Sequence, residues 1–158
     1  MRIIGIDPGM AIVGYSIIDA EGESLRLVTS GSIQTDKNLS DSKRIKEIYD
    51  DLSFLIKKYN PDEASIEKLF FFKNQKTVMP VSEARGAILL ALENAGVKIN
   101  EYTPIEIKQT LTGYGRASKD EVAKSVQLVL VGQNLPKLDD TVDSIAMAIC
   151  HVRNLVCV

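Results

Sequence analysis

The sequence predicts an α/β fold in which helices flank a mixed five-stranded sheet. Three short strand-like segments joined by tight turns come first, which favours an antiparallel meander. Helical segments then alternate with two further strands, an order typical of parallel pairing. The chain has 158 residues, of which 45% are hydrophobic, so it can bury the core of a single domain over residues 1–158. The expected sheet therefore combines three antiparallel strands with two parallel ones.

The first three strands are indicated by short apolar runs between turns. Arg2–Asp7 is mostly apolar and meets a Pro-Gly turn at once, which predicts a buried central strand. Residues 12–19 are rich in Ile, Val and Tyr and predict a second strand. A turn at residues 19–22 leads into residues 25–33, where apolar and polar residues alternate as in a third strand.

The first helix is predicted over residues 42–59, where apolar side chains recur at helical spacing. These side chains belong to Ile45, Ile48, Leu52, Leu55 and Ile56. The pair Asn60-Pro61 ends the helix. Glu63–Glu67 then predicts a short strand, which is expected to run parallel to the first strand because a helical connection precedes it.

The second half of the chain predicts one more strand and several helices. A long helix over residues 77–95 leads to a fifth strand over residues 97–102. Pro104 suits the first turn of a short helix. Residues 118–121 form a Ser-x-x-Glu capping pattern that predicts the start of another helix. The last helix is predicted over residues 140–156.

Two acidic residues end predicted parallel strands. Asp7 closes the first strand and Glu67 closes the fourth. Ligands of α/β sheets gather at the carboxyl ends of the strands, so the two side chains are expected at one edge. Asp7 taken alone is also compatible with a solvated residue that starts a turn, a common place for Asp.

Two more acidic residues open the last helix. Asp140 and Asp143 are three residues apart, so they share a face near the positive end of the helix dipole. Ordinary stabilising acids of a first helical turn have the same pattern. Asp139 adjoins Asp140, which leaves open a shift by one residue in which acid binds.

Four carboxylates brought together without counter-ions would repel each other and raise each other's pKa. No Lys or Arg within these motifs neutralises all four acids. Hard divalent cations would, and a ligand set made only of oxygen suits magnesium or manganese rather than zinc. Two such ions roughly 4 Å apart stabilise the attacking and leaving oxygens of a phosphodiester displacement.

These motifs together resemble a known nuclease family. The motifs that carry the resemblance are Ile4-Gly5-Ile6-Asp7-Pro8-Gly9, Gly14, Ile66-Glu67-Lys68-Leu69-Phe70, Lys108-Gln109-Thr110 and Asp140-Thr141-Val142-Asp143-Ser144-Ile145-Ala146. They span nearly the whole chain in order and are similar to the RuvC family of Holliday-junction resolvases. The resemblance implies an RNase H-like fold, and it makes Asp7, Glu67, Asp140 and Asp143 the catalytic, metal-binding carboxylates.

The resemblance also implies an activity and partners. It implies a magnesium-dependent endonuclease of homologous recombination and DNA repair, with two ions in each site and manganese as a substitute. Such an enzyme resolves a four-way DNA junction by paired, symmetric hydrolysis, leaving 5′-phosphate and 3′-hydroxyl ends. The family further implies a homodimer and a branch-migration helicase complex. We expect a cytoplasmic protein, since no signal pattern and no apolar run of membrane-spanning length is present.

A basic middle region is expected to meet the DNA. The chain carries a net charge of −2, yet eight Lys and Arg stand against four Glu between Lys68 and Lys119. The resemblance raises Lys108 and Lys119 to phosphate contacts near the cut. The remaining basic residues that would extend the strip are Lys73, Lys76, Arg85 and Arg116. Any one of them is equally compatible with ordinary solvated surface.

Three consecutive aromatic residues follow the second acidic motif. Phe70, Phe71 and Phe72 cannot all face inward in a strand, so one of them could wedge between bases at a junction. The resemblance points to Phe70 for that role, with the other two packing inside. The long helix after them is apolar over much of its surface, which fits either its own sheet or the two-fold interface of a dimer.

The remaining distinctive side chains are expected to be structural. His151, the only histidine, lies about 12 Å along the last helix from Asp143, too far for a catalytic base. Cys150 and Cys157 are expected to be reduced thiols on that helix.

Three other functions compete with the nuclease interpretation. The phosphate loop of a sugar-kinase or actin-like ATPase also begins Ile-Gly-Ile-Asp, but 158 residues are too few for two such domains. A junction-binding module without activity is disfavoured by acids at all four positions. An RNA-directed or transposase-like relative is disfavoured by the acid spacing and by the position of Phe70.

Overall fold

A computed structural model describes residues 1–22, 24–68, 75–136 and 139–156 of the chain. Within these ranges the fold comprises the following strands and helices, in chain order: β1 (Arg2–Asp7), β2 (Ile12–Glu21), β3 (Ser24–Gln34), α1 (Asp41–Tyr59), β4 (Glu63–Glu67), α2 (Gln75–Asn94), β5 (Lys98–Tyr102), α3 (Pro104–Thr112), α4 (Lys119–Val129) and α5 (Asp139–Val156). None of these described helices is long and apolar enough to cross a membrane.

The sheet has the strand order β3-β2-β1-β4-β5. β1 pairs antiparallel with β2, and β2 pairs antiparallel with β3. β4 runs parallel to both β1 and β5. The predicted mixed sheet of three antiparallel and two parallel strands is therefore confirmed.

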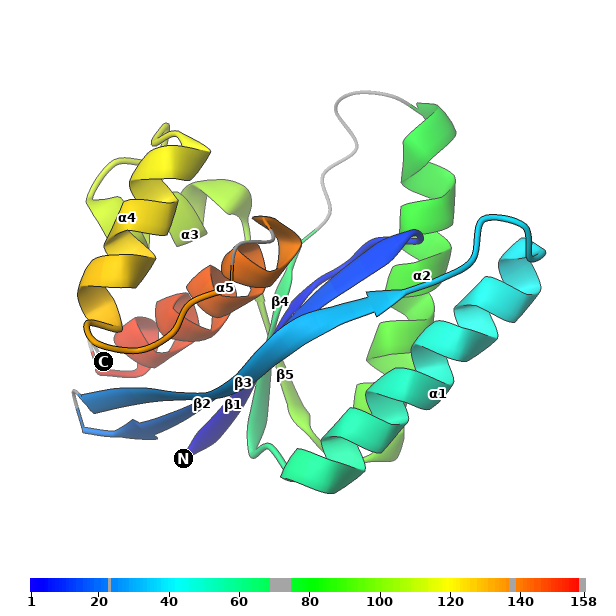
Figure 1. Cartoon of the computed structure of the whole chain (residues 1–158), viewed down its shortest axis with the longest axis horizontal. Helices are drawn as coiled ribbons and strands as arrows, with labels where there is room; N and C mark the ends of the chain where they lie inside the picture. The colour runs from blue at the N-terminus through cyan, green and yellow to red at the C-terminus, as the bar shows by residue number, and fades with distance from the viewer. Residues whose placement is uncertain (23, 69–74, 137–138, 157–158) are drawn as a thin grey trace.

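Helices cover both faces of the sheet (Figure 1). α1 and α2 lie on one face, whereas α3, α4 and α5 lie on the other. Successive residues of a strand point to opposite faces, so Ile4 and Ile6 of β1 pack with α1 and α2, and Ile3 packs with α5. All three side chains are fully buried, as expected for a central strand between two helical layers.

The bounds of β1 and β4 agree with the predicted ones, and the other boundaries differ by at most two residues. α2 begins at Gln75 rather than at residue 77, and α5 begins at Asp139 rather than at residue 140. Ser118 and Glu121 form the predicted capping box of α4. A second capping box, between Thr103 and Glu106, opens α3 and was not predicted. The Thr103 box fixes the start of α3 directly after β5, and the Ser118 box fixes the start of α4 beside Lys119.

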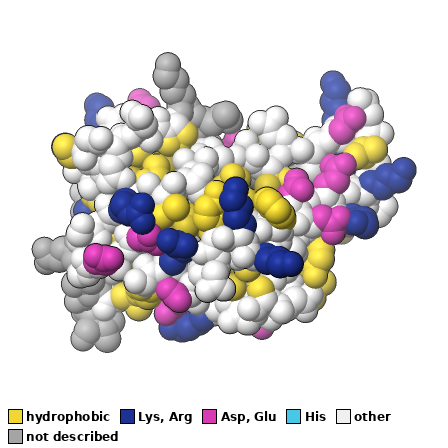
Figure 2. Space-filling model, turned by 60° about the horizontal axis from the view of Figure 1, so that its bottom comes forward, with side chains coloured by type: hydrophobic (Ala, Val, Ile, Leu, Met, Phe, Trp, Pro, Cys, Tyr) yellow, Lys and Arg dark blue, Asp and Glu magenta, His cyan; other side chains and the backbone are white. Residues whose placement is uncertain are grey.

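Charged side chains are mixed on the face that Figure 2 presents. Several Lys and Arg side chains cross the middle of that face among exposed apolar atoms, with Asp and Glu beside them and at the right. The described residues there therefore present charges of both signs.

Candidate active site

The four predicted carboxylates line one cavity of about 340 Å³. Lys108 and Lys119 line the same cavity. Its apolar wall consists of Pro104, Ile107, Val122, Ala146 and Met147. The structure thus brings together acids that lie up to 136 positions apart in the sequence, from Asp7 to Asp143.

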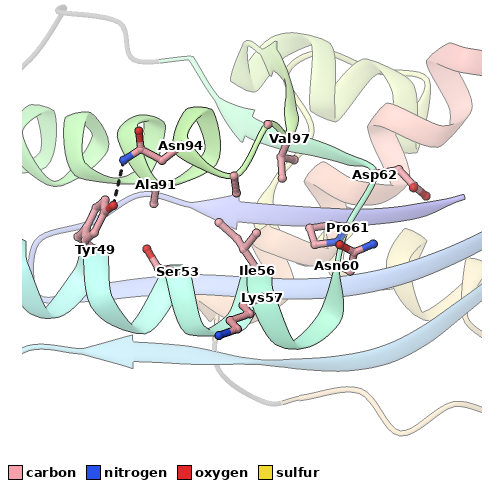
Figure 3. A pocket seen from close by; sticks show the side chains of 12 residues that line it. Tyr49, Ser53, Ile56, Lys57, Asn60, Pro61, Asp62, Ala91, Asn94 and Val97 are labelled. Atoms are coloured by element: carbon pink, nitrogen blue, oxygen red, sulfur yellow. Dashed lines mark hydrogen bonds between the residues drawn. The ribbon is translucent and has the colours of Figure 1, made fainter.

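A larger cavity, of about 630 Å³, lies between the last turns of α1 and α2 (Figure 3). Its wall includes the hydrogen-bonded side chains of Tyr49 and Asn94, whose Oη and Nδ2 atoms are 3.0 Å apart. Asp62 is its only acidic lining residue among those described, and it precedes β4, at the end opposite Glu67. Convergent acids therefore single out the smaller cavity as the candidate active site.

Strand pairing places Asp7 beside Glu67. Each is the last residue of its strand, and the preceding residues, Ile6 and Ile66, are partners in the parallel ladder. Parallel strands end at the same edge of a sheet, so the two carboxylates emerge together there.

Two glycines allow α5 to bring the other acids to this edge. A Cβ atom on Gly14 would lie 2.0 Å from the carbonyl oxygen of Asp140. A Cβ atom on Gly5 would lie equally close, at 2.0 Å, to the carbonyl oxygen of Ser144. Gly14 is also the ladder partner of Asp7. The first turns of α5 therefore rest directly on the backbones of β1 and β2, which any side chain there would prevent.

One buried hydroxyl ties β4 to the same helix. Ser65 lies two residues before Glu67, and its Oγ donates a 2.7 Å hydrogen bond to the carbonyl oxygen of Met147. Met147 lies one turn beyond Asp143 on α5. The bond thus links the two elements that carry Glu67 and Asp143.

Burial and neighbouring carboxylates shift the pKa values of two acids of the cavity, Asp7 and Glu67. Burial, followed by the charges of Glu67, Asp143 and Asp140, raises the pKa of Asp7 to about 8. Burial and the charge of Asp143 also raise the pKa of Glu67. Both groups are thus held in a setting that disfavours their negative charge.

A lysine partly offsets this repulsion. Nζ of Lys119 lies 3.2 Å from Oδ2 of Asp143. The charge of Asp143 raises the pKa of Lys119, while Lys119 in turn lowers the pKa of Asp7 and of Glu67. The charge of Lys108 also acts to lower the pKa of Glu67, but two ammonium groups cannot balance four carboxylates, so further positive charge would stabilise the site.

The donor set fits a divalent cation. Within the described ranges, no three or more His, Cys, Asp or Glu side chains stand in the arrangement of a preformed metal site. The four carboxylates nevertheless supply oxygen ligands only, the type that magnesium and manganese prefer. Their mutual repulsion is what such an ion would relieve. Asp140 lines the cavity, whereas Asp139 is exposed at the helix start.

The predicted DNA contacts lie in different surroundings. Lys108 is at the cavity, and Arg116 is exposed between α3 and α4. Lys76 belongs to the first turn of α2. Arg85 is instead largely buried and paired with Glu101. Phe70, Phe71, Phe72 and Lys73 lie outside the described residues.

His151 has the structural surroundings that were expected of it. The side chain is 1% exposed, its Nε2 is 3.0 Å from Glu63, and its Nδ1 is 2.7 Å from the Tyr102 hydroxyl. Cys150 is buried on the same helix, whereas Cys157 lies outside the described residues.

Sequence reasoning missed the residues that hold the acids in place. Gly5, Gly14 and Ser65 had no assigned role in the geometry, although both glycines were among the residues of the resemblance. A glycine inside a strand is a known sign of close backbone approach, and that signal was available for both glycines. No comparable local signal marks Ser65.

Comparison with known proteins identifies the family. A family model described as RuvC, crossover junction endodeoxyribonuclease, matches residues 3–151. The crossover junction endodeoxyribonuclease RuvC of Brevibacillus brevis is 48% identical over 153 residues, covering 97% of this chain and 92% of the relative. The RuvC protein of Halothermothrix orenii is likewise 48% identical, over 151 residues that cover 96% of this chain and 92% of the relative.

Solved structures agree with this result. Thermus thermophilus RuvC in complex with a Holliday junction substrate has a TM-score of 0.92 and 28% identity, covering 99% of this chain and 96% of the other. A fowlpox virus resolvase bound to Holliday junction DNA has a TM-score of 0.66 at 19% identity, covering 99% of each chain, and supports the fold alone. With an RNase H-like sheet and four carboxylates in one cavity, this chain belongs to the RuvC family of crossover junction endodeoxyribonucleases.

Proposed function

We propose that this protein resolves four-way DNA junctions in homologous recombination and DNA repair. The observation that carries the proposal is the convergence of Asp7, Glu67, Asp140 and Asp143 on one cavity in a chain of this family. The cleavage would be hydrolytic and symmetric, and it would leave 5′-phosphate and 3′-hydroxyl ends. Two copies of the chain would present two such sites to the two-fold symmetric junction.

The four carboxylates would hold magnesium, with manganese as a substitute and two ions in each site. When bound, such ions lower the pKa of water and stabilise the leaving 3′ oxygen. Asp7 and Glu67 are fixed at strand ends, so their oxygens would be held rigidly for this task. Asp7, with its raised pKa, would give up its proton as the metal enters.

The lysines of the cavity would bind the scissile phosphate. Lys108 lies on its wall, and Lys119, 70% exposed, is held toward the site by Asp143. Both ammonium groups would contribute positive charge where the transition state gains negative charge. Pro104, Ile107 and Val122 form part of the apolar wall of the cavity.

The rest of the DNA would be bound along the basic middle region. Lys73, Lys76 and Arg116 would contact phosphates without reading sequence. Phe70 would insert between bases at the crossover. A branch-migration helicase complex would deliver the junction to the dimer. Because phosphate contacts dominate, the affinity for the junction should fall steeply with salt.

A comparison of substrates tests the proposal. A labelled synthetic four-way junction and a linear duplex of the same sequence are incubated with the protein, in magnesium and in chelator. Paired nicks in the junction alone, and only with magnesium, are expected. Tight junction binding without cleavage under any divalent ion would instead identify a binding module. Equal cleavage of junction and duplex would overturn the structure selectivity.

A further inference from the structure

Arg85 connects α2 to the strand end that carries Glu67. Its guanidinium forms an ion pair with the carboxylate of Glu101 on β5. Its Nε also donates a 3.4 Å hydrogen bond to the backbone carbonyl of Glu67, the last residue of β4. One side chain thus bridges a helix and two neighbouring strands at the edge of the candidate active site.

The hydrogen bonds between β4 and β5 explain how the Arg85 bridge can restrain the carboxylate of Glu67. Glu67 pairs with Tyr102 in the β4–β5 ladder, which continues through a 2.8 Å bond from Lys68 N to the Tyr102 carbonyl oxygen. Glu67 is the last residue of β4. A carbonyl anchored by a fixed guanidinium restrains the peptide unit from which the Glu67 side chain departs.

Burial makes Arg85 poorly suited to hold a DNA phosphate. Its side chain is only 16% exposed, whereas that of Lys119 is 70% exposed. Ile88, one turn later on α2, is fully buried, so Arg85 is on the sheet-facing side of its helix. Burial lowers the pKa of Arg85, which indicates a desolvated guanidinium. Two of its three guanidinium nitrogens, Nε and Nη2, donate to Glu67 and Glu101.

We propose that Arg85 is a positioning residue that, together with Glu101, fixes the backbone of Glu67 for metal binding and cleavage. The inference rests on the proposed function, and it replaces the phosphate contact expected from the sequence. Residues that orient metal ligands typically contribute about 10- to 100-fold to metal affinity or activity when they are mutated.

Substitutions of Arg85 and of Glu101 distinguish the positioning role from a direct contact between Arg85 and a DNA phosphate. Positioning predicts that Arg85→Gln and Glu101→Gln act in the same direction, because each breaks the same bridge. Each should slow single-turnover junction cleavage by roughly 10- to 100-fold and raise the half-saturating magnesium concentration. The double variant should be no worse than either single variant. A phosphate contact predicts that Glu101→Gln leaves binding unchanged or tightens it, since it removes a negative charge.

Junction binding in chelator provides the second readout. Positioning predicts less than about twofold change in affinity for both variants and an unchanged salt dependence. Loss of a phosphate contact in Arg85→Gln would instead reduce the slope of log affinity against log salt by about 0.9. That result, or wild-type cleavage by Glu101→Gln, would overturn the positioning role. Glu93→Gln, an exposed acid on α2, serves as the matched control with unchanged cleavage.

A conservative variant and a measurement that does not depend on cleavage complete the test of the positioning role. Arg85→Lys retains the charge but lacks the fork that spans both partners, so positioning predicts impaired cleavage and a phosphate contact predicts nearly full cleavage. Magnesium-induced thermal stabilisation measures metal affinity without any cleavage. If the wild-type protein failed to cut junctions, the proposed function would fall. A smaller magnesium-induced stabilisation in Arg85→Lys than in Glu93→Gln would still support positioning, and equal stabilisation would refute it.

Discussion

Two polar clusters are both built from β4 and α5, but they shift the pKa of their glutamate in opposite directions. β4 contributes Glu63 to one cluster and Glu67 to the other, and α5 contributes His151 and Asp143 respectively. At Glu63, burial raises the pKa, but hydrogen bonds from Asn100, Lys98 and His151 outweigh burial and the net pKa is lowered. At Glu67, burial and the charge of Asp143 act together and the pKa is raised.

Burial alone therefore does not decide whether the pKa of a carboxylate in this fold is raised or lowered. The Glu63 cluster is satisfied internally: Asn100 Nδ2 donates at 2.8 Å and His151 Nε2 lies at 3.0 Å. The Tyr102 hydroxyl at Nδ1 and the carboxylate at Nε2 together assign the proton of a neutral His151 to Nε2. In the cavity cluster, by contrast, the one hydrogen bond found among the described residues runs from Lys119 to Asp143, and the pKa values of Asp7 and Glu67 stay raised.

The largest expected difference between the clusters is in catalysis. Glu67→Gln should reduce junction cleavage by more than about 1,000-fold, beyond the 10- to 100-fold typical of residues behind a metal ligand. Glu63→Gln should leave cleavage within about threefold, because an amide can retain hydrogen bonds in that cluster. Single-turnover cleavage in magnesium measures both. Equal losses in the two variants would mean that the clusters are not functionally distinct.

The second difference is in stability without metal. Asp7→Asn should raise the free energy of unfolding in chelator by up to about 4 kcal/mol at pH 7, since a pKa raised from 3.8 to about 8 disfavours the folded carboxylate. That cost is absent below pH 3.8 and complete above pH 8. Glu63→Ala should lower stability by about 3 kcal/mol, because it leaves buried donors unpaired. Urea unfolding measures both, and changes of the same sign would contradict the contrast.

A third difference is in how metal binding depends on pH. Asp7, with a pKa of about 8, carries a proton at neutral pH, and an entering cation must displace it. The half-saturating magnesium concentration should therefore fall by up to about tenfold per pH unit as pH rises toward 8, and then level off. Magnesium titrations of cleavage at pH 6.5, 7.5 and 8.5 test this. A requirement that stays constant would show that no cavity carboxylate binds a proton in competition.

The smallest expected effect concerns acid stability of the satisfied cluster. Burial lowers the pKa of His151, although Glu63 opposes this, so protonation is disfavoured in the folded protein. Stability should be complete above pH 6.5 and should fall by about 1 kcal/mol per pH unit below it. Tyr102, Glu63, Asn100 and, through Glu63, Lys98 are the groups around the ring. His151→Gln should flatten this slope in urea unfolding at pH 5.5 and 7.5. A slope unchanged by the substitution would assign it elsewhere.

Local patterns in the sequence were sufficient to predict the strands of the sheet and to select the four acids that line one cavity. Apolar runs, β-rich composition or alternation marked the strands, and Asp7 and Glu67 were predicted at strand ends, where parallel pairing brings them together. The pairing of Glu63 with His151, which are 88 residues apart, leaves no local pattern, nor does the bridge from Arg85 to Glu101. Such contacts depend on how helices lie on the sheet, and periodicity does not specify that arrangement.

The seating of α5 on Gly5 and Gly14 has a consequence for the newly made chain. During translation, β1, β2 and β4 leave the ribosome well before residues 139–156, which supply Asp140 and Asp143. Until that helix docks against the two glycines, the growing polypeptide carries only half of the carboxylates of its site. We therefore expect a polypeptide truncated before α5, which lacks Asp140 and Asp143, not to cleave DNA.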